Sequence, residues 1–172
     1  MTQNKRIVVL GLGNLIRSDD GVGVHAVRML MEDSRVPDGI EVIEGGTAGL
    51  DLLAAIADAT HVLALDAVNT GAAGGTLTRF DLSQLGLLPG SPSVHQNGFA
   101  DLMEALRWLD KASKQVVLLG VQPAYTGWSD ALSEEVEAAL PQLVRAALQE
   151  LKVWTQDTPT DAHKESEEKQ CV

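Results

Sequence analysis

The sequence predicts an α/β sandwich of three layers, in which helices flank both faces of a mostly parallel, five-stranded sheet. The first observation is a set of almost uninterrupted apolar runs, IVVLGL, VLAL and VVLLGV, typical of strands that are covered on both faces. The second is that segments with helical spacing of apolar residues separate these runs, so that strands and helices alternate. With 172 residues, the chain is long enough for one domain with a substantial core.

Five segments have the pattern of a strand. Three of them are the apolar runs, and the fourth, TLTRF, alternates polar and apolar residues, which favours an edge position. The predicted strands are Arg6–Leu12, Ile40–Glu44, His61–Asp66, Thr76–Phe80 and Gln115–Val121.

Helical patterns lie between the strands and give the order β-α-β-α-β-β-α-β-α. The last helix is expected to start at Ser133, because acids follow in the first turn, where the helix dipole favours them, and to kink at Pro141. The other helices are predicted after Asp20 (Val24, Val27, Met31), over Leu50–Ala57, and from near Asn97 through Phe99–Leu106.

Composition limits the classes of partner. Twenty-four acidic side chains stand against 13 basic ones, a net charge of −11, which argues against nucleic acid and anionic membranes as ligands. No apolar stretch has the length of a membrane span, and the N-terminal residues lack a signal-peptide core, so a cytoplasmic protein is expected. No coiled-coil pattern demands a dimer, and we expect a monomer.

The final residues differ from the rest. After Trp154 the sequence TQDTPTDAHKESEEKQCV has hardly an apolar residue. We therefore predict a single domain over residues 1–154 and a disordered, acidic tail over residues 155–172.

Three residues carry the chemistry that the sequence offers: Asp20, Asp66 and His95. Asp20 lies between the first strand and its helix, Asp66 ends the third strand, and His95 is expected in a loop before the helix near Asn97. Because the carboxyl ends of parallel strands meet at one rim of a sheet, we expect the three side chains to meet there. Two carboxylates and an imidazole form an open divalent-metal site with positions left for water or substrate.

Each of these residues also has a structural interpretation. In the DDG segment one aspartate can cap the following helix, and we assign the cap to Asp19, which leaves Asp20 facing the crevice. An aspartate at a strand end, such as Asp66, often accepts hydrogen bonds from the next loop. A lone histidine such as His95 is more often a capping or surface residue than a ligand.

The GLGN turn after the first strand offers an alternative, a nucleotide-binding α/β module. That fingerprint needs a third glycine, where this chain has Ile16, and its helix should start directly after the turn. Both features are missing, so the turn is weak evidence for a dinucleotide.

A hydrolase built on this chain would use carboxylates, a metal ion or both. The sequence contains no GxSxG elbow, and its single cysteine, Cys171, lies next to the end of the chain. Gly45, Gly46 and Thr47 predict a loop that shapes the substrate cleft, because small residues let an extended peptide approach the backbone.

Several segments, taken together, resemble the nickel-iron hydrogenase maturation endopeptidases. They run in unbroken order from about Ile7 to Leu151, and several separated motifs in order are more specific than any single one. The segments are GLGNLIRSDDGVGV at the start, EGGTAGLDLL at Glu44–Leu53, the aspartate of ALDAV at Asp66, SVHQNGFADLMEAL at Ser93–Leu106, LLGVQP at Leu118–Pro123 and ALS at Ala131–Ser133.

The resemblance implies an α/β endopeptidase that removes a C-terminal extension from a hydrogenase large-subunit precursor after nickel insertion. It places the metal-contacting groups at Asp20, Asp66 and His95, with nickel supplied by the precursor and other divalent cations able to occupy the isolated site. Cleavage is then either metal-directed or of the aspartic type, with an unligated carboxylate as general base. A non-catalytic nickel-binding checkpoint or chaperone and the nucleotide-binding module stay open as alternatives.

Overall fold

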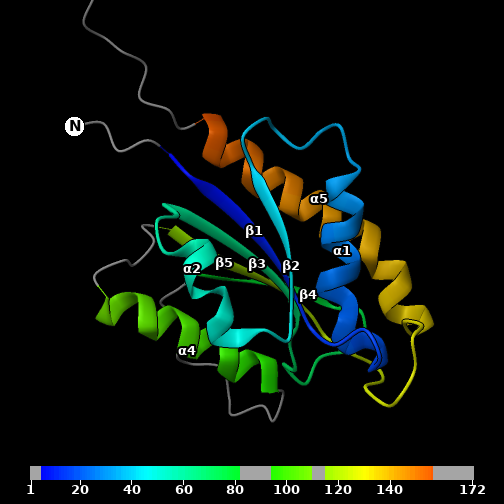
Figure 1. Cartoon of the computed structure of the whole chain (residues 1–172). Helices are drawn as coiled ribbons and strands as arrows, with labels where there is room; N and C mark the ends of the chain where they lie inside the picture. Colours follow the sequence, from blue (N-terminus) through cyan, green and yellow to red (C-terminus); the bar gives the residue numbers. More distant parts are fainter. Residues whose placement is uncertain (1–4, 82–93, 110–114, 157–172) are drawn as a thin grey trace, which may run out of the picture.

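The chain folds into the three layers that the sequence predicts. The computed structural model describes residues 5–81, 94–109 and 115–156, with the backbone alone at positions 94–98 and 100. Within these residues a single sheet lies between two layers of helices (Figure 1). The predicted order of strands and helices is confirmed.

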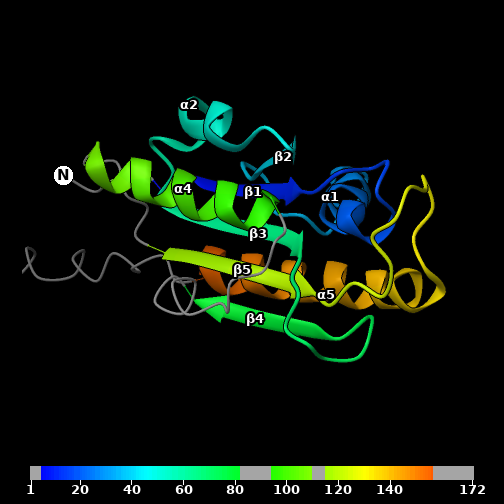
Figure 2. The ribbon, with the colours of Figure 1, turned by 90° about the horizontal axis from the view of Figure 1, so that it is seen from below.

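The sheet contains five strands in the order β2-β1-β3-β5-β4, which follow one another across Figure 2. Four of them are parallel, and β4 pairs with β5 in the antiparallel sense at the edge predicted for TLTRF. The prediction of a mostly parallel sheet is therefore confirmed. The strands are β1 (Ile7–Leu12), β2 (Glu41–Gly46), β3 (His61–Ala67), β4 (Leu77–Asp81) and β5 (Gln115–Val121).

Helices cover both faces of the sheet. In Figure 1 α1 and α5 lie on one side of the strands, and α2 and α4 lie on the other. Two short 3-10 segments, η1 and η2, lead into α1 and α2. The bounds are η1 (Ser18–Gly21), α1 (Val22–Met31), η2 (Gly49–Leu52), α2 (Leu53–Ile56), α4 (Val94–Trp108) and α5 (Glu134–Gln156).

The first turn of α4 corrects one prediction. The helix begins at Val94 instead of near Asn97, so His95 is the second residue of a helix and not part of the preceding loop. Asn97 and Gly98 are weak helix formers, and from sequence alone they suggest a boundary. Burial of Phe99, together with other apolar residues of α4, supplies the packing that outweighs this local preference.

The core is divided by the sheet into two clusters, because successive strand residues point to opposite faces. In β1, Ile7 and Val9 pack with residues of α1 and α5, whereas Val8 and Leu10 pack with residues of α2 and α4. The same alternation in β3 and β5 explains why those sequences are apolar at almost every position.

Glycines bring α1 very close to the sheet. A Cβ atom added at Gly11 would lie 2.5 Å from the carbonyl oxygen of Gly23. One added at Gly23 would meet the carbonyl oxygen of Leu65 far inside van der Waals contact. Glycine at both positions therefore allows α1 to begin directly against the ends of β1 and β3.

The last helix ends two residues beyond the predicted domain end. α5 runs as one helix through the exposed Pro141 to Gln156, so Thr155 is helical, and its hydroxyl donates to the carbonyl oxygen of Leu151 at 2.9 Å. Residues 157–172 of the predicted tail lie outside the described residues. None of the described helices is both long and apolar enough to cross a lipid bilayer.

We expect a chain that ends at Gln156 to keep the stability of the full chain, whereas Trp154→Ala lowers it by about 3–5 kcal/mol. Trp154 is buried, and its indole lies 5.1 Å from the ring of His61, measured between centroids. Denaturant unfolding of the full chain, the truncated chain and the Trp154 variant tests this. A large loss of stability on truncation would mean that residues 157–172 contribute to the fold.

Candidate active site

Two loops that are distant in sequence, residues 14–20 and 124–133, are joined by hydrogen bonds; we call this pair the loop clamp. Ser18 donates its backbone N–H to the carbonyl oxygen of Ser129 at 2.8 Å, and Ser129 donates in return to Ile16 at 3.2 Å. In Figure 1 the blue turn before α1 and the yellow loop before α5 lie side by side. Because these loops follow β1 and β5, the clamp lies at the carboxyl ends of parallel strands, where ligands bind in such sheets.

Asp19 is the centre of the loop clamp. Its carboxylate is fully buried and accepts four hydrogen bonds: from the backbone N–H groups of Ala124, Tyr125 and Ser133, and from the Ser133 hydroxyl, at 2.7–2.8 Å. Hydrogen bonds to a charged acceptor are among the stronger ones, so a single side chain fixes the loop before α5.

The prediction that Asp19 caps its own helix is wrong. Neither η1 nor α1 has a side-chain cap, and the Asp19 carboxylate instead binds the residue that precedes α5. Ser133 in turn accepts the N–H of Val136 at 3.3 Å and so caps α5 at the predicted start. The sequence marked Ser133 as a helix start, but nothing in it joins positions 19 and 133.

Asp20 lies in η1, directly beside Asp19 in sequence. Its Oδ2 atom accepts the backbone N–H of Asn14 at 3.1 Å, and only 7% of the residue is exposed. η1 packs against β3, the strand that carries Asp66. The two aspartates of the DDG segment thus have separate environments, as predicted, although the partner of Asp19 is different.

Asp66 is the penultimate residue of β3 and is 1% exposed. Its Oδ1 atom accepts the backbone N–H of Ala67 at 2.8 Å. Val62 and Ala64 of the same strand belong to the core cluster under α2 and α4. By strand alternation, Asp66 therefore points to the face that α4 covers.

The side chain of His95 lies outside the described residues, but its backbone is placed in the first turn of α4. Phe99, one helical turn later, packs in the core cluster that contains Val62 and Ala64. The face of the sheet onto which Asp66 points is thus the face that the His95 helix covers. A contact of the imidazole with either aspartate stays a prediction.

The segment Gly45–Gly46–Thr47 differs from the loop that the sequence predicts, because both glycines belong to β2. The pairing of β2 with β1 shifts between Gly11 and Leu12, and Gly45 is the extra residue of this bulge.

Only part of this segment faces open space. Gly45 is buried, and a Cβ there would lie 2.9 Å from the side chain of Leu12, so a larger residue would require the Leu12 side chain to move. Gly46 has a φ of 52°, and a Cβ there would be 3.9 Å from its nearest neighbour, while Thr47 is exposed. Their contact with a substrate remains a prediction.

Glu44, which precedes these glycines, is held by a cation. Arg28 of α1 donates to both carboxylate oxygens, at 2.9 and 3.1 Å. These hydrogen bonds hold the pKa of Glu44 below its usual range. Glu44 thus links α1 to β2 as an ionised group, and this pairing gives it a structural role.

The GLGN turn has little room for a pyrophosphate. Gly11 faces Val27 and Gly23 of α1, and Gly13, with a φ of 120°, lies directly against the carbonyl oxygen of Asp20. A dinucleotide fingerprint uses such glycines to let phosphate approach the backbone. Here the chain's own atoms fill that space, which disfavours the nucleotide-binding alternative.

The described residues thus place two buried carboxylates at one rim of the sheet. Among the side chains that the structure describes, no three His, Cys, Asp or Glu groups lie close enough to hold a metal ion. The imidazole of His95 is not among these side chains, so the predicted set of three ligands stays a prediction. Oxygen and imidazole donors in such a set suit a divalent transition metal with open positions.

The chain matches a known protein family over most of its length. Residues 24–150 match the family model described as hydrogenase maturation protease. This range is most of the chain and contains Asp66 and His95, while Asp20 lies just before it.

Individual relatives and solved structures agree with this family. The chain is 35% identical over 151 residues to the hydrogenase 2 maturation protease of Escherichia coli, covering 84% of this chain and 92% of that protein. It is 35% identical over 146 residues to the hydrogenase expression/formation protein HoxM of Azotobacter vinelandii, covering 83% and 70%. The structure of the hydrogenase maturating endopeptidase HybD from E. coli superposes with a TM-score of 0.81 at 33% identity, covering 87% and 93%.

We expect Asp19→Asn to lower the free energy of unfolding by about 1.5–3 kcal/mol. An amide nitrogen would replace a carboxylate oxygen that accepts hydrogen bonds from N–H donors. Asp130→Asn is the matched control, since Asp130 lies on the same loop but is exposed. Denaturant unfolding of the two variants measures the difference. Equal stability of both variants would contradict the role assigned to Asp19.

Proposed function

This chain belongs to the hydrogenase maturation protease family, and from this membership we propose that it removes the C-terminal extension of a nickel-iron hydrogenase large-subunit precursor. The cut follows nickel insertion, and the chain acts as a cytoplasmic monomer. Membership in the family makes it a peptidase. The choice of precursor, the role of nickel and the residues that act are the parts that we propose.

The observation that carries this proposal is the pair of buried aspartates at one rim of the sheet. Asp20 comes from η1 and Asp66 from β3, two elements that contact each other. Each carboxylate is oriented by a backbone N–H, from Asn14 and Ala67 respectively. Carboxylates held in this way are preorganised to meet a cation or to take a proton from water.

In this proposal the nickel belongs to the substrate. The precursor presents the ion on its own ligands, and Asp20, Asp66 and His95 offer two carboxylates and one imidazole to complete its coordination. Proteins usually bind nickel with more nitrogen or sulfur donors than this set contains, so such a site has weak affinity when no precursor is bound. Only a loaded precursor would then dock productively, which couples cleavage to nickel insertion.

Hydrolysis of the peptide bond needs an activated water. A precursor-bound nickel would act as a Lewis acid on the scissile carbonyl, whereas a carboxylate that does not contact the ion would act as general base. These routes correspond to the metal-directed and aspartic alternatives. They predict different results when the precursor carries another divalent ion, because only the first route depends directly on the Lewis acidity of that ion.

We expect Asp20→Asn and Asp66→Asn to abolish cleavage while the protein stays folded. Each substitution preserves the shape of the side chain and removes the negative charge that a cation or a proton requires. The measurement is cleavage of nickel-loaded precursor, with circular dichroism as the check on folding. Asp20→Glu is the control for Asp20, because it restores the charge one methylene further out.

Normal cleavage by either asparagine variant would overturn the proposed site. Nickel-dependent binding of the precursor by the wild-type chain with no cleavage would instead favour the checkpoint or chaperone alternative. Cleavage of loaded precursor, and none of nickel-free precursor, is the outcome that the proposal requires.

We expect His95→Ala to weaken binding of nickel-loaded precursor, because alanine cannot donate a lone pair to the ion. Pull-down of loaded and nickel-free precursor measures this, with the melting temperature as the second measurement. A structural role in the first turn of α4 predicts a different result, a loss of about 1 kcal/mol in stability with binding retained. That second result would restrict the site to the two aspartates.

A further inference from the structure

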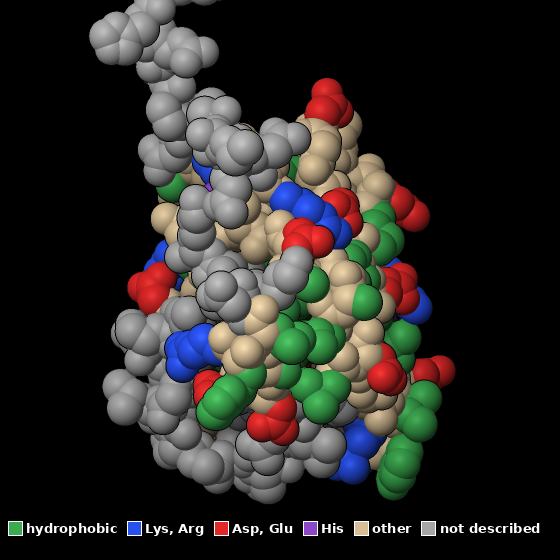
Figure 3. All heavy atoms as spheres, turned by 60° about the vertical axis from the view of Figure 1, so that its left-hand side comes forward, with side chains coloured by type: hydrophobic (Ala, Val, Ile, Leu, Met, Phe, Trp, Pro, Cys, Tyr) green, Lys and Arg blue, Asp and Glu red, His purple; other side chains and the backbone are tan. Residues whose placement is uncertain are grey.

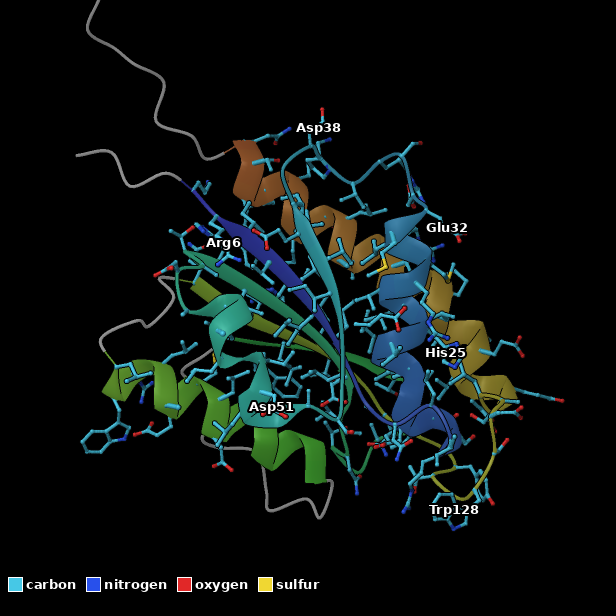
Figure 4. All side chains as sticks on the ribbon, viewed as in Figure 1. Arg6, His25, Glu32, Asp38, Asp51 and Trp128 are labelled. Atoms are coloured by element: carbon cyan, nitrogen blue, oxygen red, sulfur yellow. The ribbon has the colours of Figure 1, made fainter. Side chains whose placement is uncertain are left out.

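The loop clamp carries three large side chains that are exposed to solvent: Ile16, Tyr125 and Trp128. We call these three side chains the aromatic patch, after the two rings that it contains. Their exposed fractions are 56%, 54% and 75%. Figure 4 shows Trp128 pointing away from the rest of the molecule, beyond the end of the loop. Exposed apolar side chains that gather in this way mark interaction sites more often than single ones do.

The backbone holds these side chains in place. Ile16 accepts the N–H of Ser129, and Tyr125 accepts the N–H of Asp19 at 3.2 Å. Arg17 donates twice to the carbonyl oxygen of Thr126, at 2.8 and 3.1 Å. These side chains are therefore exposed on a loop that is already ordered, so the loop itself would lose little conformational entropy when a partner binds.

Two further contacts involve the aromatic rings themselves. The guanidinium carbon of Arg17 lies 5.5 Å from the centroid of a Trp128 ring, a cation–π distance. The Tyr125 hydroxyl lies directly over Gly127, where a Cβ atom would overlap it, so glycine allows this ring position. The Trp128 ring thus contacts a cation of the other loop of the clamp, and the Tyr125 ring lies over its own loop.

Few charged side chains are exposed on the two loops that carry the patch. Residues 14–20 and 124–133 contain one basic side chain, Arg17, and three acidic ones, of which Asp19 and Asp20 are buried and Asp130 is exposed. Figure 3 brings forward a different face, the side of the molecule on which α2 and α4 lie in Figure 1; there acidic side chains are scattered and basic ones form no continuous area. An exposed arginine beside apolar rings therefore suits a partner with apolar side chains and a carboxylate.

We propose that the aromatic patch is the docking surface for the hydrogenase large-subunit precursor, which places apolar side chains on Trp128 and Tyr125 and a carboxylate against Arg17. This inference rests on the proposed function. The same loop clamp holds Asp20, so a precursor that reaches the carboxylates comes close to the patch. Aromatic and arginine side chains dominate the energetics of many interfaces.

A second copy of this chain is a poorer occupant. Two chains of the same charge, −11 each, repel one another, and three side chains are far fewer than the roughly 20–30 residues per side of a stable interface. A precursor, in contrast, also gains the contacts at Asp20 and Asp66, so the patch needs to supply only part of the affinity.

Steady-state cleavage of nickel-loaded precursor by Trp128→Ala and by Trp108→Ala tests this proposal. Trp108 is 83% exposed and ends α4, so it is a matched control for the removal of a surface indole. We expect Trp128→Ala to raise KM at least tenfold with kcat and melting temperature unchanged. Trp108→Ala should change neither constant, and Trp128→Phe should restore most of the affinity.

The outcomes separate this proposal from the proposed function. If the wild-type chain cleaves loaded precursor and Trp128→Ala does so with the same KM, docking at the patch is wrong and the site stands. If the wild-type chain cleaves no precursor, the proposed function fails and the docking proposal fails with it. Sedimentation that shows a wild-type dimer, lost in Trp128→Ala, would assign the patch to self-association and overturn the proposal.

Discussion

The buried carboxylate of Asp19 is the interaction on which the geometry of the candidate site depends. It takes hydrogen bonds from Ala124, Tyr125 and Ser133, and so joins the loop after β1 to the loop after β5. A buried charge is costly unless it is fully hydrogen-bonded, and these donors satisfy it. The same bonds that stabilise the charge therefore fix both loops at the rim of the sheet.

The close approach of α1 to the sheet is the second constraint. Gly11 and Gly23 allow the helix to begin against the ends of β1 and β3, and Gly13 lies against the carbonyl oxygen of Asp20. A side chain at any of these three glycines would push η1, and with it Asp20, away from β3. The glycine-rich turn thus serves the placement of a carboxylate, where a similar turn in a dinucleotide fold serves a phosphate.

The sequence was sufficient for what depends on local pattern. Periodicity and apolar runs predicted the strands and helices, because both faces of the sheet are covered and the signal is strong. Prediction from the sequence failed where a contact between distant residues determines the role of a side chain, as for Asp19 and Ser133. It also failed where packing outweighs local helix preference, as at the start of α4. The bulge at Gly45 likewise lies in the pairing of β2 with β1, and the side chains that crowd it, Leu12 and Leu52, are its neighbours only in the folded chain.

The two adjacent aspartates, Asp19 and Asp20, have different roles although they are neighbours in one short segment. Asp19 is completely buried and structural, whereas Asp20 retains some exposure at the rim. Ser18, the residue before them, has a φ of 48°, a conformation rare for serine, and its N–H and hydroxyl bind Ser129 and Ala131. The tight turn at Ser18 is therefore held by the same loop that Asp19 fixes. Any change that loosens this loop would move Asp20 and the aromatic patch together, so binding and chemistry at this rim depend on one set of hydrogen bonds.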